Sequence, residues 1–552
     1  MERAADFGTL IKKHQARRKD REKCNAAPRI FSEDVCRPRD TISMNAHVPR
    51  IKLQFIVALL IGVSICPVLL VTIPAMVDYP NHLARMFILT GDGTQDANPF
   101  YQVTWALYPN LAMDLLIPQL ARLMSVESAT RSFLLFSQVL IVTGSIAIER
   151  IVKGHFHIAG AAAVMFLYCL PFAWGFVNFE FSLGIALWGI ALSLGVQERG
   201  WPLRLAVNSI LVAALFVGHF FALGIYGATL GVHELWRAWD RKALYLDTLA
   251  RLAVLVIPAG ALLGLMAFTG GSVGGAGTRW VFSAKSLWLM HIMNGYSLTA
   301  SALSVAVLVS LLYVGTKRGA VRFEPGGAWI ATGFAILYLA MPFKLFDTAF
   351  VDLRVIVAAA FILPAFISLS LPSRQWQLAA MSCVISITIV NLAVVLFVWT
   401  SYRAEYAAMI ESFGKIDKGS LVLIGHSGEG DDPPIDLAEY PIYHAPILAV
   451  YYAKAFVPNL FTAVGKQPVT VRAPYQHLAI PYGGPVPTAI LAAIVEGRLS
   501  TGVPSFIQAW HRDYDYLYIV GPRIPNPMPA LLEELNSASR FVLYKIRKPK
   551  PS

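Results

Sequence analysis

The first 400 residues alternate between long apolar runs and short polar segments. An α-helix needs about 20 consecutive apolar residues to cross the hydrocarbon core of a bilayer, so each long run is a candidate membrane span. The pattern predicts about eleven spanning helices. They cover approximately residues 53–77, 132–149, 158–176, 180–197, 203–218, 220–236, 249–269, 298–315, 328–343, 353–371 and 377–400.

The segments before and after the first span are polar or mixed. Residues 1–50 are polar and basic, which predicts a disordered cytoplasmic arm. Residues 78–131 form an outer loop, in which 81–90 and 111–124 carry apolar residues at helical spacing between polar ones. Such a pattern indicates helices that lie along the membrane interface. We therefore expect a transmembrane domain at 51–400 that includes this loop.

The apolar runs become short after residue 400. Runs of strand length at 421–424, 516–520 and 541–544 alternate with stretches of helical pattern at 487–497 and 528–537. Such alternation is typical of α/β domains. The expected fold class is an α-helical polytopic membrane protein with about eleven spanning helices and a small C-terminal α/β soluble domain at 401–552.

Composition agrees with this interpretation. The chain is 56% hydrophobic and 14% charged, and its mean hydropathy is +0.56. About a quarter of the residues of a soluble chain are charged, so a polytopic membrane protein is strongly favoured. The net charge of +12 lies mainly in the first residues and in short loops, as expected of cytoplasmic segments rather than of a nucleic-acid surface. The five cysteines form neither a disulfide framework nor a zinc motif.

The basic residues predict an orientation. Arg50 and Lys52 precede the first span, and Lys and Arg collect on the cytoplasmic side of membrane proteins. The later basic clusters also fall on that side if 203–236 forms two helices broken near Gly218 and His219. The expected topology is a multi-pass protein of the bacterial cytoplasmic (inner) membrane, with a cytoplasmic N-terminus and an extracytoplasmic C-terminal domain.

This topology gathers ionisable groups at the outer face. Charged groups near membrane depth are costly, so they are functional candidates by default. The candidates are Asp78, His82, Arg85, Glu180, His219, Arg279, Lys285, Asp352 and Arg354.

Several of these candidates also have a structural alternative. Asp78 can cap the helix that follows it, with Pro80 in the first turn. His82 and Arg85 can be interfacial residues whose polar ends reach water. Asp352 at a helix entrance can simply pair with Arg354.

The remaining candidates are open in the same way. Glu180 can be a turn cap, and His219 can be a polar residue buried in a helix bundle. Arg279 and Lys285 follow the glycine-rich stretch 270–277 and can meet a phosphate. The stretch lacks the spacing of a P-loop, so a flexible linker is the favoured interpretation.

Asp78 with His82 and Arg85, and more loosely Asp352 and Arg354, resembles the GT-C superfamily of membrane glycosyltransferases, in particular its poorly described bacterial members. The architecture is also similar: a first span, an outer loop that opens with an acid, interfacial helices, further spans and an outer C-terminal domain. This resemblance covers approximately residues 50–400. Many members have adjacent acids where this chain has Asp78 followed by Tyr79. No metal-binding pattern of the family is evident, so a divalent metal remains an open alternative and no cofactor is assigned.

The resemblance implies transfer of a sugar from a polyprenyl-phosphate-linked donor to an envelope glycan, lipid or protein. Asp78 would be the general base, and the other candidates would bind the lipid phosphate, the sugar or the acceptor. Its partners would be the lipid-linked donor, membrane lipids and the acceptor, with no nucleic acid. Two alternatives remain open: a transporter or flippase for a lipid-linked or polar solute, and a non-catalytic envelope assembly protein.

Overall fold

The computed structural model describes residues 50–91, 98–155, 159–269, 277–371, 373–428, 436–480, 483–499 and 501–548. Contacts divide the chain into two compact units, Met1–Leu53 and Gln54–Ser552. Apart from the first turn of helix α2, all described elements lie in the second unit. The expected arm at 1–50 and nearly all of the glycine-rich stretch 270–277 lie outside the described residues.

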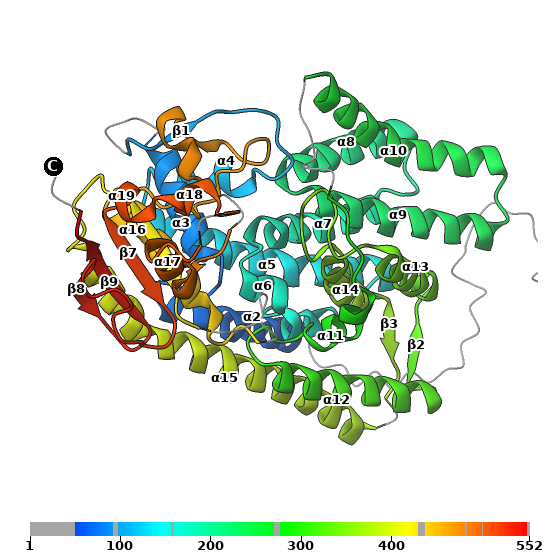
Figure 1. The fold of residues 1–552 in the computed structure, drawn as a ribbon. Coiled ribbons are helices and arrows are strands. Elements are labelled where there is room, and N and C mark those ends of the chain that lie inside the picture. Colours follow the sequence, from blue (N-terminus) through cyan, green and yellow to red (C-terminus); the bar gives the residue numbers. More distant parts are fainter. Residues whose placement is uncertain are drawn as a thin grey trace, which may run out of the picture. The chain divides into compact units, whose positions relative to one another are not determined.

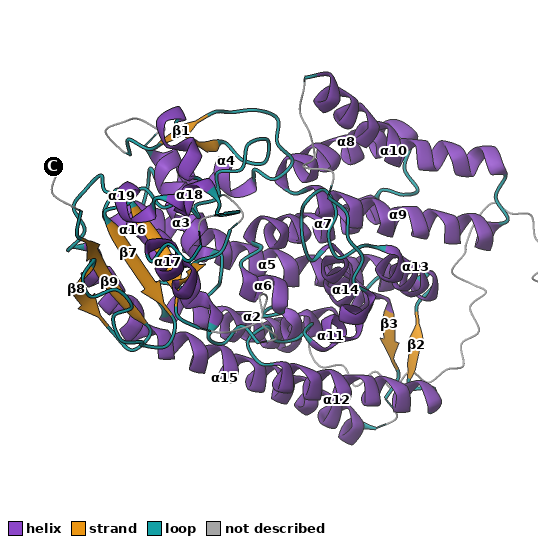
Figure 2. Ribbon diagram, in the orientation of Figure 1, coloured by secondary structure: helices purple, strands orange, loops and turns teal. Residues whose placement is uncertain are grey.

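Helices dominate the chain as far as residue 413 (Figures 1 and 2). They are α2 (Arg50–Leu70), α3 (Tyr79–Thr90), α4 (Ala112–Leu120), α5 (Val126–Lys153), α6 (Leu170–Trp174), α7 (Val177–Gly195), α8 (Trp201–Gly218), α9 (Phe220–Arg241), α10 (Tyr245–Phe268), α11 (Lys285–Met290), α12 (Leu298–Lys317), α13 (Gly327–Ala340), α14 (Val351–Ile362) and α15 (Arg374–Phe413).

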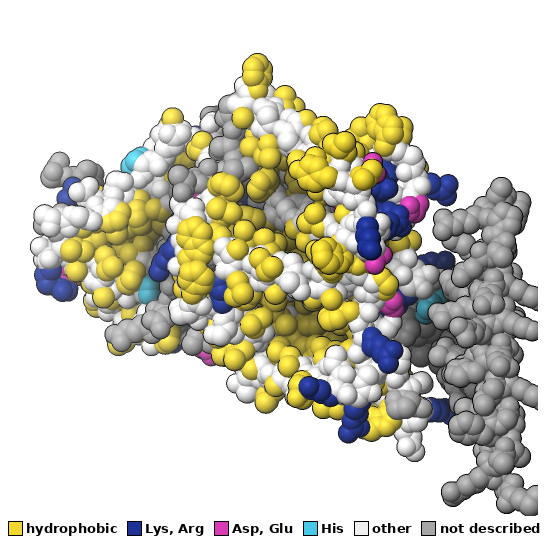
Figure 3. All heavy atoms as spheres, turned by 90° about the vertical axis from the view of Figure 1, so that its right-hand side faces the viewer, with side chains coloured by type: hydrophobic (Ala, Val, Ile, Leu, Met, Phe, Trp, Pro, Cys, Tyr) yellow, Lys and Arg dark blue, Asp and Glu magenta, His cyan; other side chains and the backbone are white. Residues whose placement is uncertain are grey.

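Six of these helices are long and apolar enough to cross a membrane, namely α5, α7, α8, α10, α12 and α15. Two shorter apolar helices are Ala58–Leu70, within α2, and α13. In the most apolar part of α10 only 6% of the residues are buried within the protein, and in that of α12 only 11%. Both helices therefore present most of their side chains to lipid. Figure 3 shows a face with many hydrophobic side chains, among which Lys and Arg side chains are scattered.

Three expected spans differ from the structure. The first helix ends at Leu70 rather than near residue 77. The stretch 158–176 contains a 3-10 helix, Gly160–Phe166, and the short α6, which begins at Leu170 with Pro171 in its first turn. The stretch 353–371 is interrupted after Ile362, where Pro364 enters a 3-10 turn. Proline disrupts an α-helix when it lies in the helix interior. These two apolar runs are therefore broken, although each is long enough to span a bilayer. The expected break between α8 and α9 is confirmed, and His219 lies at it.

A five-stranded sheet occupies the C-terminal region, in the order β6-β4-β7-β9-β8. The strands of the chain are β1 (Tyr101–Val103), β2 (Val321–Phe323), β3 (Ile367–Leu369), β4 (Val422–His426), β5 (Val469–Val471), β6 (Val486–Pro487), β7 (Tyr516–Val520), β8 (Leu532–Ser537) and β9 (Phe541–Ile546). The accompanying short helices are α16 (Ala449–Tyr452), α17 (Thr488–Val495), α18 (Ser505–Gln508) and α19 (Trp510–Asp513). Strand β4 is parallel to β6 and β7, whereas β9 is antiparallel to β7 and β8. The expected fold class, with its C-terminal α/β part, is confirmed.

One expected helix of this region is wrong. The stretch 528–537 ends in strand β8, which forms the edge of the sheet by pairing with β9. Glu533 and Glu534 are exposed there, as is common for charged side chains on an edge strand. Pairing with a remote strand has overridden the local preference for a helix.

The helical part and the sheet are joined by α15. This helix has 40 residues, which corresponds to about 60 Å and is about twice the thickness of a bilayer core. The hydroxyl of Ser412 near its end lies 2.7 Å from that of Tyr518 on β7. The expected domain boundary at residue 401 thus falls within a helix, and the position of the boundary stays a prediction.

The loop 78–131 is bound to the C-terminal region. Strand β1 pairs antiparallel with β5, and the Tyr101 hydroxyl donates to the carbonyl of Val457 at 2.9 Å. The helical patterns at 81–90 and 111–124 correspond to α3 and α4, and their position at the membrane interface stays a prediction. Contacts of α3 with the segment Ala445–Leu448 place the C-terminal region beside the helix that follows Asp78.

Candidate active site

Asp78 precedes the first residue of α3 and occupies the N-cap position. Pro80 lies in the first turn, as the sequence indicates, but the Asp78 side chain makes no capping hydrogen bond. The backbone N–H of Asp78 donates instead to the carbonyl of Trp174 at 2.8 Å. Asp78 is partly exposed, whereas the first turn of α3 after it is buried. A role as helix cap therefore accounts for the position of Asp78 in the chain, but it assigns no function to the carboxylate, which makes no capping bond.

The turn Trp174-Gly175-Phe176 packs directly against Asp78. Gly175 has φ +96°, and a Cβ atom there would lie 3.0 Å from the Cβ of Asp78 and 3.1 Å from its backbone nitrogen. Only glycine combines this left-handed conformation with so close an approach. The turn is thus built to bring Asp78 against the end of α6.

His82 is held against the same turn. Its Nε2 lies 2.9 Å from the carbonyl oxygen of Gly175, so Nε2 carries the proton and donates. Burial lowers the pKa of His82 to about 3, and the neighbouring Arg85 guanidinium lowers it further. A neutral imidazole with a fixed tautomer results. Its Nδ1 is buried, has no hydrogen-bond partner and is left as an acceptor.

Arg354 places a positive charge against this turn. Its guanidinium carbon lies 4.3 Å from the ring centroid of Phe176 and 5.5 Å from that of Phe221, and the side chain is buried. The guanidinium donates to the carbonyl of Ala349. It lies within electrostatic reach of the Asp78 and Glu180 carboxylates. Among the described residues, however, it forms no salt bridge with either of them.

Glu180 and His219 complete the buried cluster. Glu180, in the first turn of α7, accepts a weak bond from the Cys169 thiol at 3.7 Å. His219 accepts from the backbone N–H of Phe221 through Nδ1 at 3.2 Å, and its ring packs edge-on against Phe179. Burial and the Arg354 charge hold the pKa of His219 well below its ordinary value, so the ring is neutral.

The electrostatic environment makes Asp78 an unusually basic carboxylate. Burial raises the pKa of Asp78 to about 8, although Arg354 and Arg85 act to lower it. A catalytic base is most effective when its pKa lies near the working pH. Its part-exposed carboxylate, which accepts no hydrogen bond from the described residues, can therefore take a proton from an incoming group.

Four candidates are engaged elsewhere. Arg85 forms a buried ion pair with Asp114 of α4 at 3.0 Å. Lys285 donates to Asp352 at 3.2 Å and to two backbone carbonyls, so Asp352 pairs with Lys285 and not with Arg354. Arg279 is exposed and joins Lys344 through reciprocal backbone hydrogen bonds. These contacts favour structural roles for Arg85 and Lys285.

Sequence reasoning missed the residues that organise the cluster. Gly175 and Phe176 carry no charge, and the signal that could have revealed them is the tight turn before Glu180. Asp114 lies in the amphipathic stretch 111–124, and nothing in that pattern singles it out as the partner of Arg85. Asn81 is buried, accepts from the backbone N–H of Phe461 at 3.0 Å and donates to Nδ1 of His444 at 3.4 Å. The C-terminal region thereby holds the first turn of α3.

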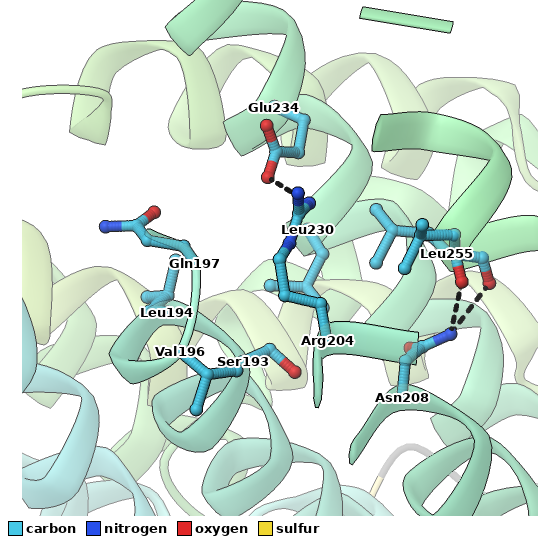
Figure 4. A pocket seen from close by; sticks show the side chains of 10 residues that line it. Ser193, Leu194, Val196, Gln197, Arg204, Asn208, Leu230, Glu234 and Leu255 are labelled. Atoms are coloured by element: carbon cyan, nitrogen blue, oxygen red, sulfur yellow. Dashed lines mark hydrogen bonds and ion pairs between the residues drawn. The ribbon is translucent and has the colours of Figure 1, made fainter. Parts of the chain in front are cut away.

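Neither Asp78 nor Arg354 lines either of two hollows that lie among the described residues. The first lies among α7, α8, α9 and α10 (Figure 4). Pro258 leaves the carbonyl of Val254 without its helical donor, and Asn208 donates to that carbonyl at 2.9 Å. Arg204 pairs there with Glu234 at 3.3 Å. We interpret this hollow as a structural joint between helices.

The second hollow lies between the end of α3 and α4. It has a volume of about 230 Å³ and is bordered by Trp105, Asp114 and Arg122. Asp114 connects it to Arg85, and hence to the helix that follows Asp78. Among the described residues, no group of three or more His, Cys, Asp or Glu side chains is placed to hold a metal ion.

No family model matches the sequence, and no curated protein matches it. Among solved structures, the crystal structure of ArnT from Cupriavidus metallidurans bound to undecaprenyl phosphate aligns with a TM-score of 0.48 and 13% identity, covering 89% of this chain and 98% of that chain. The apo structure of the same protein aligns with a TM-score of 0.46 and 12% identity, covering 90% and 98%. Both TM-scores are below 0.5, so the function proposed next rests on the residues of this protein.

Proposed function

We propose that the protein is a GT-C glycosyltransferase of the bacterial cytoplasmic membrane. It transfers a hexosyl or pentosyl group from a polyprenyl-phosphate-linked donor to an envelope glycan, lipid or protein. The reaction takes place at the outer face of the membrane, where the loop 78–131 and the C-terminal domain 401–552 meet. Asp78 is the general base.

The observation that carries this proposal is the uncommitted carboxylate of Asp78. It occupies a cap position without capping, remains partly exposed and lies within reach of the Arg354 charge. A carboxylate that served only the helix would bond to the N–H groups of the first turn. Its high pKa and its position beside a buried cation are typical of a functional site.

The chemistry is a single displacement. An Asp78 carboxylate oxygen takes the proton of the acceptor hydroxyl as that oxygen forms a bond to the anomeric carbon. The bond from the anomeric carbon to the phosphate oxygen breaks, and the polyprenyl phosphate leaves with the electron pair. The configuration at the anomeric carbon is inverted. General-base assistance of this kind contributes roughly 10²–10⁴-fold to the rate.

Arg354 is the group best placed to stabilise the leaving phosphate. A guanidinium binds phosphate oxygens through two parallel N–H groups, and a site with little water strengthens the attraction. Its Nε is buried without a hydrogen-bond partner. Arg279, being exposed, can meet the phosphate from the loop side. His82, Glu180 and His219 are assigned to sugar or acceptor hydroxyls.

The test uses the full chain in lipid nanodiscs, labelled undecaprenyl-phosphate-linked hexoses and pentoses, and an envelope extract as acceptor. Asp78→Asn keeps the shape of the side chain and removes the base, so transfer should fall by roughly 10²-fold or more. The matched control is Glu533→Gln, which removes an exposed acid from the sheet edge and should leave transfer unchanged.

Donor binding separates the roles. Asp78→Asn should bind undecaprenyl phosphate as tightly as the native protein, whereas Arg354→Gln should bind it more weakly. Undiminished transfer by Asp78→Asn would remove the role given to Asp78. Absence of transfer with every donor, together with solute uptake into vesicles, would favour the transporter alternative.

A further inference from the structure

A row of three aromatic side chains runs from the Asp78 turn into the C-terminal region. The ring centroids of Trp174 and Tyr440 are 5.5 Å apart at an interplanar angle of 68°. Those of Tyr440 and Tyr443 are 5.1 Å apart at 25°, in a stacked arrangement. Because the carbonyl of Trp174 accepts the backbone N–H of Asp78, the row begins at the proposed base.

The row differs from the aromatic core. Trp174, Tyr440 and Tyr443 are all partly exposed, whereas Trp399 and Tyr518, among the largest aromatic side chains of the interior, are buried. The two tyrosines come from one C-terminal turn, and the tryptophan comes from a segment more than 260 residues earlier in the chain. The fold therefore assembles a surface of rings at the junction between the helices and the C-terminal region.

Polar groups accompany the rings. The His444 ring lies 6.2 Å from that of Tyr440, and its Nδ1 contacts the Asn81 amide of α3. Both tyrosines also bring a hydroxyl, which can donate and accept. Apolar ring faces and polar groups thus occur together along the row that begins at the Trp174 turn.

This combination identifies the class of ligand. A sugar ring has apolar C–H faces that can lie on an aromatic ring, and hydroxyls around its edge that need hydrogen-bonding partners. An acyl chain has no group that could bond to an imidazole and two phenols, and the largely exposed apolar stretches of α10 and α12 are better suited to lipid. Binding sites for small molecules pair apolar walls with a few placed polar groups in this way.

We propose that Trp174, Tyr440 and Tyr443 form the acceptor subsite and that the acceptor is bound through saccharide units, one of which presents its hydroxyl to Asp78. The inference rests on the proposed function and narrows its acceptor to one that carries a glycan. The C-terminal region then supplies two of the three rings, which gives it a role in substrate recognition.

The test measures binding without turnover. The full chain carrying Asp78→Asn, in nanodiscs, is applied to an array of bacterial envelope oligosaccharides. Adding Tyr440→Ala or Tyr443→Ala should weaken binding of the retained oligosaccharide by about tenfold, because each change removes one stacking partner. Tyr440→Phe keeps the ring and should lose less affinity than Tyr440→Ala.

The matched control is Tyr475→Ala. Tyr475 is also a partly exposed tyrosine of the C-terminal region and packs on Phe100 at 4.8 Å, but it is not part of the row. It should leave binding unchanged. If an alanine variant fails to fold, as judged by its elution and melting temperature, Tyr443→Leu retains the bulk and answers the same question.

Two results would overturn the proposal: no oligosaccharide on the array is bound, or the bound one is held equally well by Tyr440→Ala and Tyr443→Ala. The proposed function is judged separately, by transfer from the labelled donors. Ring-dependent saccharide binding without any transfer would leave the subsite standing and remove the transferase. Transfer with no dependence on the rings would do the reverse.

Discussion

Asp78 shows how much a single position can be predicted. Its sequence context, with Pro80 two residues later, predicted both a helix cap and a base, and both assignments place it at the start of α3. The missing capping hydrogen bond distinguishes them, and that depends on where the side chain turns in three dimensions. The sequence could not show that its nearest packing partner would be Gly175, almost 100 residues away.

The high pKa of Asp78 predicts the pH dependence of transfer. Only the ionised carboxylate can accept a proton, and burial raises its pKa to about 8. We expect kcat/KM to rise with pH and to level off above about pH 8. Arg354 favours the ionised form, so Arg354→Gln should move the apparent pKa upward as well as lower the rate. The measurement is a profile of kcat/KM between about pH 5.5 and 9.5. This range extends about one pH unit or more to each side of the expected midpoint.

Arg498→Gln is the control for this profile. Arg498 is exposed and pairs with Glu496 in the C-terminal region. It should leave the midpoint in place. A rate that is independent of pH over this range would show that Asp78 does not titrate in the rate-determining step.

At the scale of elements, the turn between α6 and α7 matters most. Gly175→Ala would place a methyl group at 3.0–3.1 Å from Asp78, in addition to the strain of a left-handed conformation. The strain alone costs of order 1 kcal/mol or more. We expect Gly175→Ala to reduce transfer strongly, because the collision displaces the base, and to lower the melting temperature.

Gly154→Ala separates strain from collision. Gly154 ends α5 with φ +72°, and a Cβ atom there would meet nothing within 4 Å. This variant should lower the melting temperature but keep nearly native transfer. Equal activities of the two variants would show that the close approach at Gly175 does not position Asp78.

Elements were predictable where their signal was local. Apolar periodicity located α7, α8, α10 and α12, and the break at His219 followed from charge counting. The interruptions at Pro171 and Pro364 lie inside apolar runs whose total length suits a span, so hydropathy alone passed over them. The partners of Arg85 and Lys285 lie 29 and 67 residues away. Such pairings depend on packing between helices, which no local pattern encodes.

At the scale of the molecule, the C-terminal region and the outer loop form one structure. Strand β1 pairs with β5, the Tyr101 hydroxyl bonds to the Val457 carbonyl, and Asn81 bonds to Phe461. Backbone hydrogen bonds cannot form across a bilayer, so both segments lie on the same side of the membrane. Asp78, Glu180 and His219 each lie within electrostatic reach of Arg354, whatever the number of spans.

This arrangement predicts a pattern of cysteine accessibility. In a variant whose five cysteines are replaced by serine, single cysteines are placed at Ala106, Val464 and Ala243. Ala106 follows β1, Val464 precedes β5, and Ala243 lies in the turn between α9 and α10; all three are exposed. The positive-inside rule puts Ala243, beside Arg241 and Lys242, in the cytoplasm. A membrane-impermeant maleimide added to whole cells should label Ala106→Cys and Val464→Cys, and should label Ala243→Cys only after permeabilisation.

Labelling of Ala106→Cys and Val464→Cys from opposite sides would contradict the β1–β5 pairing. Labelling of Ala243→Cys alone in intact cells would reverse the orientation and place the proposed active site in the cytoplasm, where an extracytoplasmic acceptor could not reach Asp78.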